Sequence, residues 1–212
     1  MAGNKMAGTR NEDKHGDLAN RAIGFLELKG AAYGVTALDV AVKAAPIDIL
    51  QAKVVCPAKF IIILAGEMAA VQIAVAVAKT SVGSGLYDEL VLGRIHPDLY
   101  CGLYDEFPTR HNEDLDGNLM EANAALAKEG EALGVVETLS MACGLASADN
   151  ALKAARVELR ELRLGFSLGG RSYFILSGAT SQVQAALAKA VKVATQWGSL
   201  GSHSLILRPA KP

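Results

Sequence analysis

The chain has few of the residues that usually mark a nucleic-acid surface or a disulfide-stabilised exported domain. Aromatic residues make up only 5% of its 212 residues, and 21 Lys and Arg are balanced by 22 Asp and Glu, for a net charge of -1. So small a net charge offers no long-range attraction to nucleic acid or to an anionic membrane. Cys56, Cys101 and Cys143 form no disulfide-scaffold spacing, which indicates a reducing, cytoplasmic compartment.

Long hydrophobic runs and catalytic patterns are also missing. Glu67 interrupts the most apolar stretch and leaves an uncharged run of 11 residues, Met68–Ala78, so we expect no membrane-spanning helix. Residues 1–20 hold no apolar stretch, and we expect a disordered extension there rather than a secretory signal. The four histidines have no metal-ligand spacing, and no Ser-His-Asp or paired-carboxylate arrangement stands out. We therefore expect no enzymatic activity.

What the chain does contain is one pattern written twice. The segment 22–45 matches the segment 132–155, with ten identical residues in 24 aligned positions, at an offset of 110 residues. A two-residue insertion near Gly169-Gly170 moves the offset to 112, and the match then continues to Pro97 and Pro209. Two copies of one domain in one chain indicate a symmetric assembly.

Hydrophobic periodicity predicts the same order of elements in each copy. Copy one is expected to form strands over 23–28, 49–55, 60–64 and 90–95, and helices over 36–45 and 67–79. Thr36 is expected to open the first helix with a variant capping box. In copy two, the apolar stripe from Val183 to Ala194 predicts a helix with Thr180 as its cap, and 204–207 the closing strand. The order β-α-β-β-α-β is that of a split βαβ sandwich, an α/β (α+β) fold.

These patterns divide the chain into a disordered extension (1–20), a first domain (21–108), a helical linker (109–131) and a second domain (132–212). Between the copies, residues 99–107 favour a short helix or a turn, and residues 114–128 favour a helix. Cys101 falls in this connection, and Cys143 falls on a short loop before a helix of copy two. We interpret both cysteines as structural.

Taken together, the motifs of both copies resemble bacterial microcompartment shell domains. Copy one has Gly-x-x-Glu in its first strand (24–27), Asp-x-Ala-x-Lys-Ala-Ala in its first helix (39–45), and an apolar strand leading into Gly-x-x-x-x-Val-Gln (66–72). The tandem arrangement resembles the trimeric shell proteins, in which three two-domain chains form a pseudohexameric tile. The resemblance implies a homotrimer in the cytoplasmic microcompartment shell, with other shell proteins at its edges and small metabolites crossing its pore.

The resemblance also assigns roles by position. The loops between the second and third strands line the pore of such tiles, which here implies Cys56, Pro57, Ala58, Lys59, Ser167, Leu168, Gly169 and Gly170. The edge contacts fall on Lys43, Lys153 and Arg208. Copy one reads His96-Pro97 where copy two reads Arg208-Pro209, so we expect the edges of the two copies to differ. The residues alone predict that Lys43 and Lys153 lie at solvated helix ends. They also predict that Gly169 and Gly170 form a turn rather than a phosphate-binding loop.

The loop Cys56-Pro-Ala-Lys59 resembles the pore loop of the propanediol-utilisation tandem shell proteins, where Cys-Pro-Gly-Lys holds an iron–sulfur cluster on the threefold axis. The implied site is a [4Fe-4S] cluster held by one Cys56 from each of three chains, with Lys59 helping to keep the thiol ionised. Ala58 replaces the family glycine, which alters the turn if that position needs a positive φ. Without a cluster, Cys56 only narrows the pore.

Three functions remain open from the sequence. The first is a structural shell tile with a pore for metabolites. The second is an electron-transfer protein that moves electrons across the shell through the pore-bound cluster. The third is a ring-shaped ligand-binding protein or enzyme that uses the same fold and never assembles into sheets.

Overall fold

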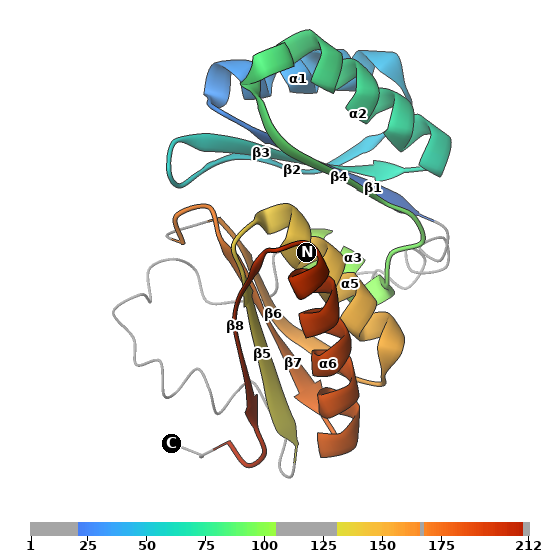
Figure 1. The fold of residues 1–212 in the computed structure, drawn as a ribbon. Helices are drawn as coiled ribbons and strands as arrows, with labels where there is room; N and C mark the ends of the chain where they lie inside the picture. The colour runs from blue at the N-terminus through green and yellow to red at the C-terminus, as the bar shows by residue number, and fades with distance from the viewer. Residues whose placement is uncertain (1–20, 105–130, 166–167, 210–212) are drawn as a thin grey trace, which may run out of the picture.

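The computed structural model describes residues 21–104, 131–165 and 168–209, in which each copy forms a four-stranded antiparallel sheet with two long helices on one face (Figure 1). Copy one contains β1 (Ala22–Leu28), α1 (Ala31–Ala44), β2 (Asp48–Val55), β3 (Lys59–Gly66), α2 (Met68–Val82), the 3-10 turn η3 (Gly83–Gly85) and β4 (Leu86–Leu92), and α3 (Pro97–Tyr104) follows it. Copy two contains β5 (Ala132–Thr138), α5 (Met141–Ala154), β6 (Glu158–Leu164), β7 (Ser172–Gly178), α6 (Thr180–Gln196) and β8 (Leu200–Ile206). The strand orders β2-β3-β1-β4 and β6-β7-β5-β8 are equivalent and confirm two tandem split βαβ domains.

Several element boundaries differ from the predicted ones. Helix α1 begins at Ala31 rather than at Thr36, whose hydroxyl donates to the Ala32 carbonyl inside the helix and caps nothing. Gly30 holds the cap position without a side-chain hydrogen bond, and glycine is one of the residues favoured there. Thr180 is the first residue of α6, and Ala179 holds the cap position without a side-chain hydrogen bond. The predicted helix at 114–128 and the extension 1–20 lie outside the described residues.

The strand registers correct the alignment at the end of each copy. Leu92 pairs with Ile23, and Ile206 pairs with Leu133, which is the counterpart of Ile23. The closing strands are therefore 206 - 92 = 114 residues apart, not 112, because α6 has 17 residues and α2 has 15. At this offset Arg208 corresponds to Arg94. The expectation that copy one places His96-Pro97 there is wrong, and both copies carry an arginine after the last strand.

The glycine of each Gly-x-x-Glu motif permits a close approach of helix and sheet. A Cβ added at Gly24 would lie 2.6 Å from Cγ2 of Val75 on α2, and one at Gly134 would lie 2.9 Å from Cγ1 of Val183 on α6. Both distances are shorter than a carbon contact allows, so a side chain would push the helix away.

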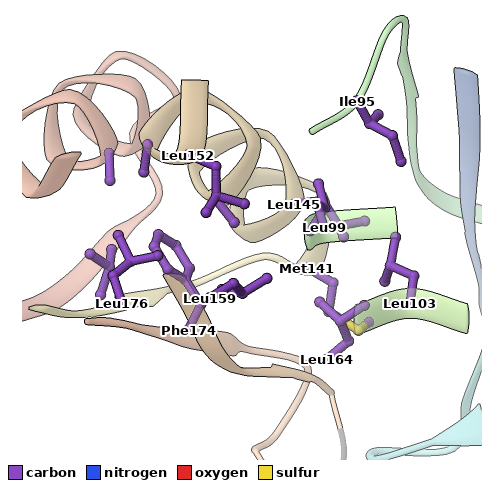
Figure 2. Packing of buried hydrophobic residues seen from close by; sticks show 14 of the residues in the cluster. Ile95, Leu99, Leu103, Met141, Leu145, Leu152, Leu159, Leu164, Phe174 and Leu176 are labelled. Carbon is purple, nitrogen blue, oxygen red and sulfur yellow. The ribbon is translucent and has the colours of Figure 1, made fainter. Parts of the chain in front are cut away.

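The two copies pack head to tail, with the free face of the first sheet on the helical layer of the second domain (Figure 1). The side chains of β1 and β3 alternate. One set packs against α1 and α2, whereas Ile23, Phe25, Ile61 and Ile63 join the cluster that contains α3, α5 and β6. Figure 2 shows α3 in that cluster, with its leucines beside side chains of α5 and β6. Most of α5 is consequently buried.

Helix α2 is more apolar than the charge-free run in the sequence suggested. The span Met68–Gly85, which includes Lys79, is long and apolar enough by composition to cross a membrane, so the short uncharged run did not decide the question. Its inner side packs against the first sheet through Val71, Ala74 and Ala78, as in the core helix of a folded domain.

The glutamate of each motif forms an ion pair across the sheet. Glu27 accepts a hydrogen bond from Lys59 Nζ at 2.5 Å, and its counterpart Glu137 faces Arg171, the counterpart of Lys59, at 3.5 Å. The Glu27 side chain is only 1% exposed, and burial raises its pKa while Lys59 opposes the rise. Within the described residues, Glu27 Oε2 has no hydrogen-bond partner. Lys59 therefore stabilises the ionised form of a carboxylate that water does not reach.

We predict that Lys59→Met lowers stability by about 3 kcal/mol at pH 7.5, because it leaves Glu27 buried and unpaired. Without the lysine, the pKa of Glu27 rises further in the folded state. A group with a raised folded-state pKa stabilises the fold at low pH and loses that contribution as the pH rises through its folded pKa. The defect should therefore be smaller at pH 5, which thermal unfolding at the two pH values would measure.

The double variant Glu27→Gln/Lys59→Met is the control and should lose this pH dependence. An equal loss of stability for Lys59→Met at both pH values would show that the ion pair is not the cause.

Candidate functional site

The connection between β2 and β3 presents a free thiol to solvent. Cys56 is exposed, and the peptide bond between Cys56 and Pro57 is cis. Ala58 has a φ of 51°, a left-handed conformation that favours glycine over alanine. Alanine at this position therefore stores backbone strain of about 1 kcal/mol.

Lys59, the first residue of β3 after this loop, has a largely buried side chain. Its amine pairs with Glu27, lies 3.3 Å from the ring centroid of Tyr87, and leaves the side chain 15% exposed. The lysine thus anchors the base of the loop.

The loop between β6 and β7 adjoins the first loop. Gly169 and Gly170 have φ values of 61° and 85°, and the Arg171 amide donates to the Leu168 carbonyl at 3.1 Å, so the glycine pair forms a turn, as predicted. A Cβ at Gly170 would lie 3.2 Å from Lys59 Nζ and 3.9 Å from Pro57 Cδ. Ser167 lies outside the described residues. The chain therefore brings the two predicted pore loops together.

The predicted edge residues lie at helix and strand ends. Lys43 and Lys153 occupy the last turns of α1 and α5, where each pairs with the aspartate four residues earlier, at 2.7 and 2.5 Å. In copy two, that aspartate, Asp149, also accepts the backbone amide of His96 at 2.8 Å. Arg94 and Arg208 are both exposed. The edge groups of the two copies thus match more closely than the sequence alignment indicated.

The other two cysteines are less accessible. Cys143 lies within α5, not on a loop before it, because the helix begins at Met141. It is fully buried, its Sγ lies 3.7 Å from the Ser147 hydroxyl, and burial raises its thiol pKa. Cys101 lies in α3 and is half-buried. Of the three cysteines, Cys56 is the one with an exposed side chain.

No group of three or more His, Cys, Asp or Glu side chains in the described part of one chain could hold a metal ion. An exposed thiol at a loop tip nevertheless fits a site assembled from several chains. Each chain would contribute one thiolate, and such ligands suit iron–sulfur clusters.

Sequence reasoning missed the polar contacts between the two domains, such as that of His96 with Asp149. Burial raises the pKa of Asp88 on β4, and the backbone amide of Glu89, Lys59 and the hydroxyl of Ser140, the N-cap of α5, oppose that rise. A carboxylate at a helix N-terminus is favoured by the helix dipole. The residues that correspond to Asp88 and Ser140 in the sequence, Ser202 and Gly30, share no chemistry with them, so the repeat itself gave no signal.

Comparisons with known proteins agree with this architecture. The BMC domain family matches residues 22–95 and 132–209. The chain is 34% identical over 190 residues to the bacterial microcompartment shell protein PduT of Citrobacter freundii, which covers 90% of this chain and 94% of that protein.

Solved structures give the same picture. A microcompartment protein from Desulfitobacterium hafniense DCB is similar with a TM-score of 0.76 at 32% identity, over 90% of this chain and 96% of that one. The fold is also similar, with a TM-score of 0.56 at 21% identity, to MSM0275, the fused permuted hexameric shell protein of the RMM microcompartment, over 83% and 82% of the two chains. Two matched domains and relatedness along nearly the whole chain place this protein in the family of bacterial microcompartment shell proteins.

Proposed function

We propose that this structural shell protein of a bacterial microcompartment works as a homotrimer, in which six shell domains surround a pore on the threefold axis. The observation that carries the proposal is the head-to-tail packing of the two domains. A contact between two different surfaces leaves one copy of each surface free in every chain. The same contact can therefore repeat from chain to chain, and it forms a ring when the rotation between neighbours closes.

The two free surfaces are the helix layer of the first domain and the outer face of the second sheet. Residues on them are exposed, whereas the equivalent residues of the other domain are buried. Tyr33 on α1 is 44% exposed, whereas its counterpart Cys143 on α5 is 0% exposed beneath the first domain. On the sheet side, the side chains of Arg171 and Glu137 are 54% and 34% exposed, against 15% and 1% for Lys59 and Glu27. If α1 of one chain packed on the second sheet of the next chain, Tyr33 and the pair of Arg171 and Glu137 would be buried. With two domains per chain and six per tile in this family, three chains close the ring.

We predict that Tyr33→Glu dissociates the trimer, because it places an unpaired charge in a buried contact, at a cost of roughly 2 kcal/mol or more for each of the three contacts. Size-exclusion chromatography with light scattering would measure the mass. Val77→Glu is the control, since Val77 on α2 is similarly exposed at 40% and lies outside the proposed contact. A wild-type monomer, or an intact Tyr33→Glu trimer, would contradict the ring.

The ring would place both loops of every chain around its axis. Residues 56–59 and 167–170 would then alternate around a pore, and small metabolites would cross the shell between them. Because the Lys59 amine is paired with Glu27, it would not point into the opening. The loops would instead present the Cys56 thiol, the Leu168 side chain and backbone groups there.

Electron transfer is the second candidate function, and the exposure of Cys56 favours it. Three Cys56 thiolates on the axis would hold a [4Fe-4S] cluster, and the fourth iron site would take water or another ligand. Such a group would supply one-electron chemistry between the cytosol and the lumen. The chain itself would supply the thiolates and the rigid loops that present them.

We predict that anaerobically prepared protein contains about one cluster per three chains, with absorbance near 400 nm. Cys56→Ser should lose the iron and keep the trimer, and Cys101→Ser should keep both. Iron quantification alongside light scattering would test this. A colourless wild-type trimer would agree with the shell tile and contradict the cluster. Iron retained by Cys56→Ser would show that the metal binds at another site.

Lateral assembly with other shell proteins would use Lys43, Lys153, Arg94 and Arg208 at the tile edge. We predict that Lys43→Ala/Lys153→Ala leaves trimers intact and prevents sheets from forming, as seen by electron microscopy. Lys192→Ala on the exposed side of α6 is the control. Normal sheets from the double variant would remove the edge assignment.

A further inference from the structure

A pocket of about 610 Å³ lies at the C-terminal end of α5, at the opposite end of β6 from the proposed pore loop. It is lined by residues 152–157, by the residue that precedes α3 and by one residue in the first turn of α6. Its polar side chains can all donate hydrogen bonds: His96, Lys153, Arg156 and Gln182. No acidic side chain is among the lining residues that the structure describes.

The two neutral side chains of the pocket have their acceptors occupied. Oε1 of Gln182 accepts the backbone amide of Arg156 at 3.0 Å, and Nδ1 of His96 accepts the backbone amide of Asp98 at 3.2 Å. The side-chain NH₂ of Gln182 and the Nε2–H of His96 therefore remain as donors. A ligand at these groups must bring acceptors.

The two cationic side chains add positive charge to these donors. Arg156 is exposed, and no carboxylate of the described residues pairs with its guanidinium. Lys153 pairs with Asp149 at 2.5 Å and keeps further ammonium protons for a ligand. The Asp149 side chain is only 4% exposed, and it also accepts the backbone amide of His96 at 2.8 Å. One buried carboxylate thus fixes two residues of the lining.

The first domain lacks this chemistry at the equivalent place. Arg156 corresponds to Pro46, and both carbonyls lie next to the glycine that ends the third strand of their copy. Gln182 corresponds to Ala70. Neither Pro46 nor Ala70 has a side-chain donor, although Lys43 is retained as the counterpart of Lys153. The proposed edge role, which both lysines share, does not account for the added donors of the second domain.

We propose that this pocket binds the phosphate group of a small molecule, either inorganic phosphate or a phosphate ester. A set of donors without a free acceptor fits an oxyanion, and an arginine can bind phosphate through two charge-assisted hydrogen bonds. The C-terminal end of α5 disfavours an anion, and the charges of Lys153 and Arg156 offset this effect. All of the lining comes from one chain, so the proposal rests neither on the ring nor on the cluster.

The test is an NMR titration of the full-length protein, labelled at its histidine rings, with inorganic phosphate at constant ionic strength. The chain has four histidines, and His96→Gln identifies the signal of His96. We expect a saturable shift of that signal and none for His203, which lies on β8 outside the pocket. Sodium chloride at the same ionic strength should cause no shift. A parallel titration with glycerol phosphate shows whether free phosphate or an ester binds more tightly.

Arg156→Gln should weaken phosphate binding about tenfold or more, because it removes a charge-assisted contact. Lys153→Ala should also weaken it, whereas Lys43→Ala, the same change in the first domain, should leave it unchanged. Circular dichroism on each variant checks the fold separately. The proposal would be overturned if the wild type showed no saturable shift, if chloride caused the same shift, or if Arg156→Gln bound phosphate as tightly as the wild type.

Discussion

The packing of the first sheet on the helical layer of the second domain is the contact on which the rest of the structure depends. The sheet carries aliphatic and aromatic side chains on both faces, so one pair of helices cannot bury it. Phe25, Ile61 and Ile63 require a second layer, and α3 and α5 provide it. Because this contact joins unlike surfaces, it leaves one helix layer and one sheet face free, and those free surfaces define the proposed ring.

The same contact places charges where water is scarce. Glu27 and Asp88 both have a pKa raised by burial. Lys59 favours the ionised form of Glu27, and the backbone amide of Glu89, Lys59 and, across the domain boundary, Ser140 favour the ionised form of Asp88. Such groups stabilise a fold only when their geometry is satisfied, so they favour one docking arrangement over alternatives. Lys59 also anchors the loop that carries Cys56, which links the domain contact to the proposed pore.

The fold was predictable because each hydrophobic pattern that indicates a strand or helix occurs in both copies. Strands and helices that are ambiguous in one copy are confirmed by the other, and the turn at Gly169-Gly170 followed from glycine chemistry alone. The error in the alignment of the last strands arose where an element length changed between the copies. Two extra residues in α6 shifted the last strand, so a match of prolines at 97 and 209 hid the true pair of Arg94 and Arg208. Contacts between the domains, such as Asp88 with Ser140, depend on a docking geometry that no local pattern specifies.

Fusion of two shell domains in one chain also changes how many times a residue is repeated around the pore. A ring of six identical domains would repeat any pore residue six times, whereas a trimer of tandem chains repeats it three times. Cys56 has no cysteine counterpart in the second loop, so the proposed ring brings three thiols to the axis, with Leu168 and its glycines between them. Three thiolates leave an incomplete tetrahedral set, which fits a cluster with one exchangeable iron position rather than a closed structural site. The divergence of the two loops would thus allow the proposed pore to bind a redox group.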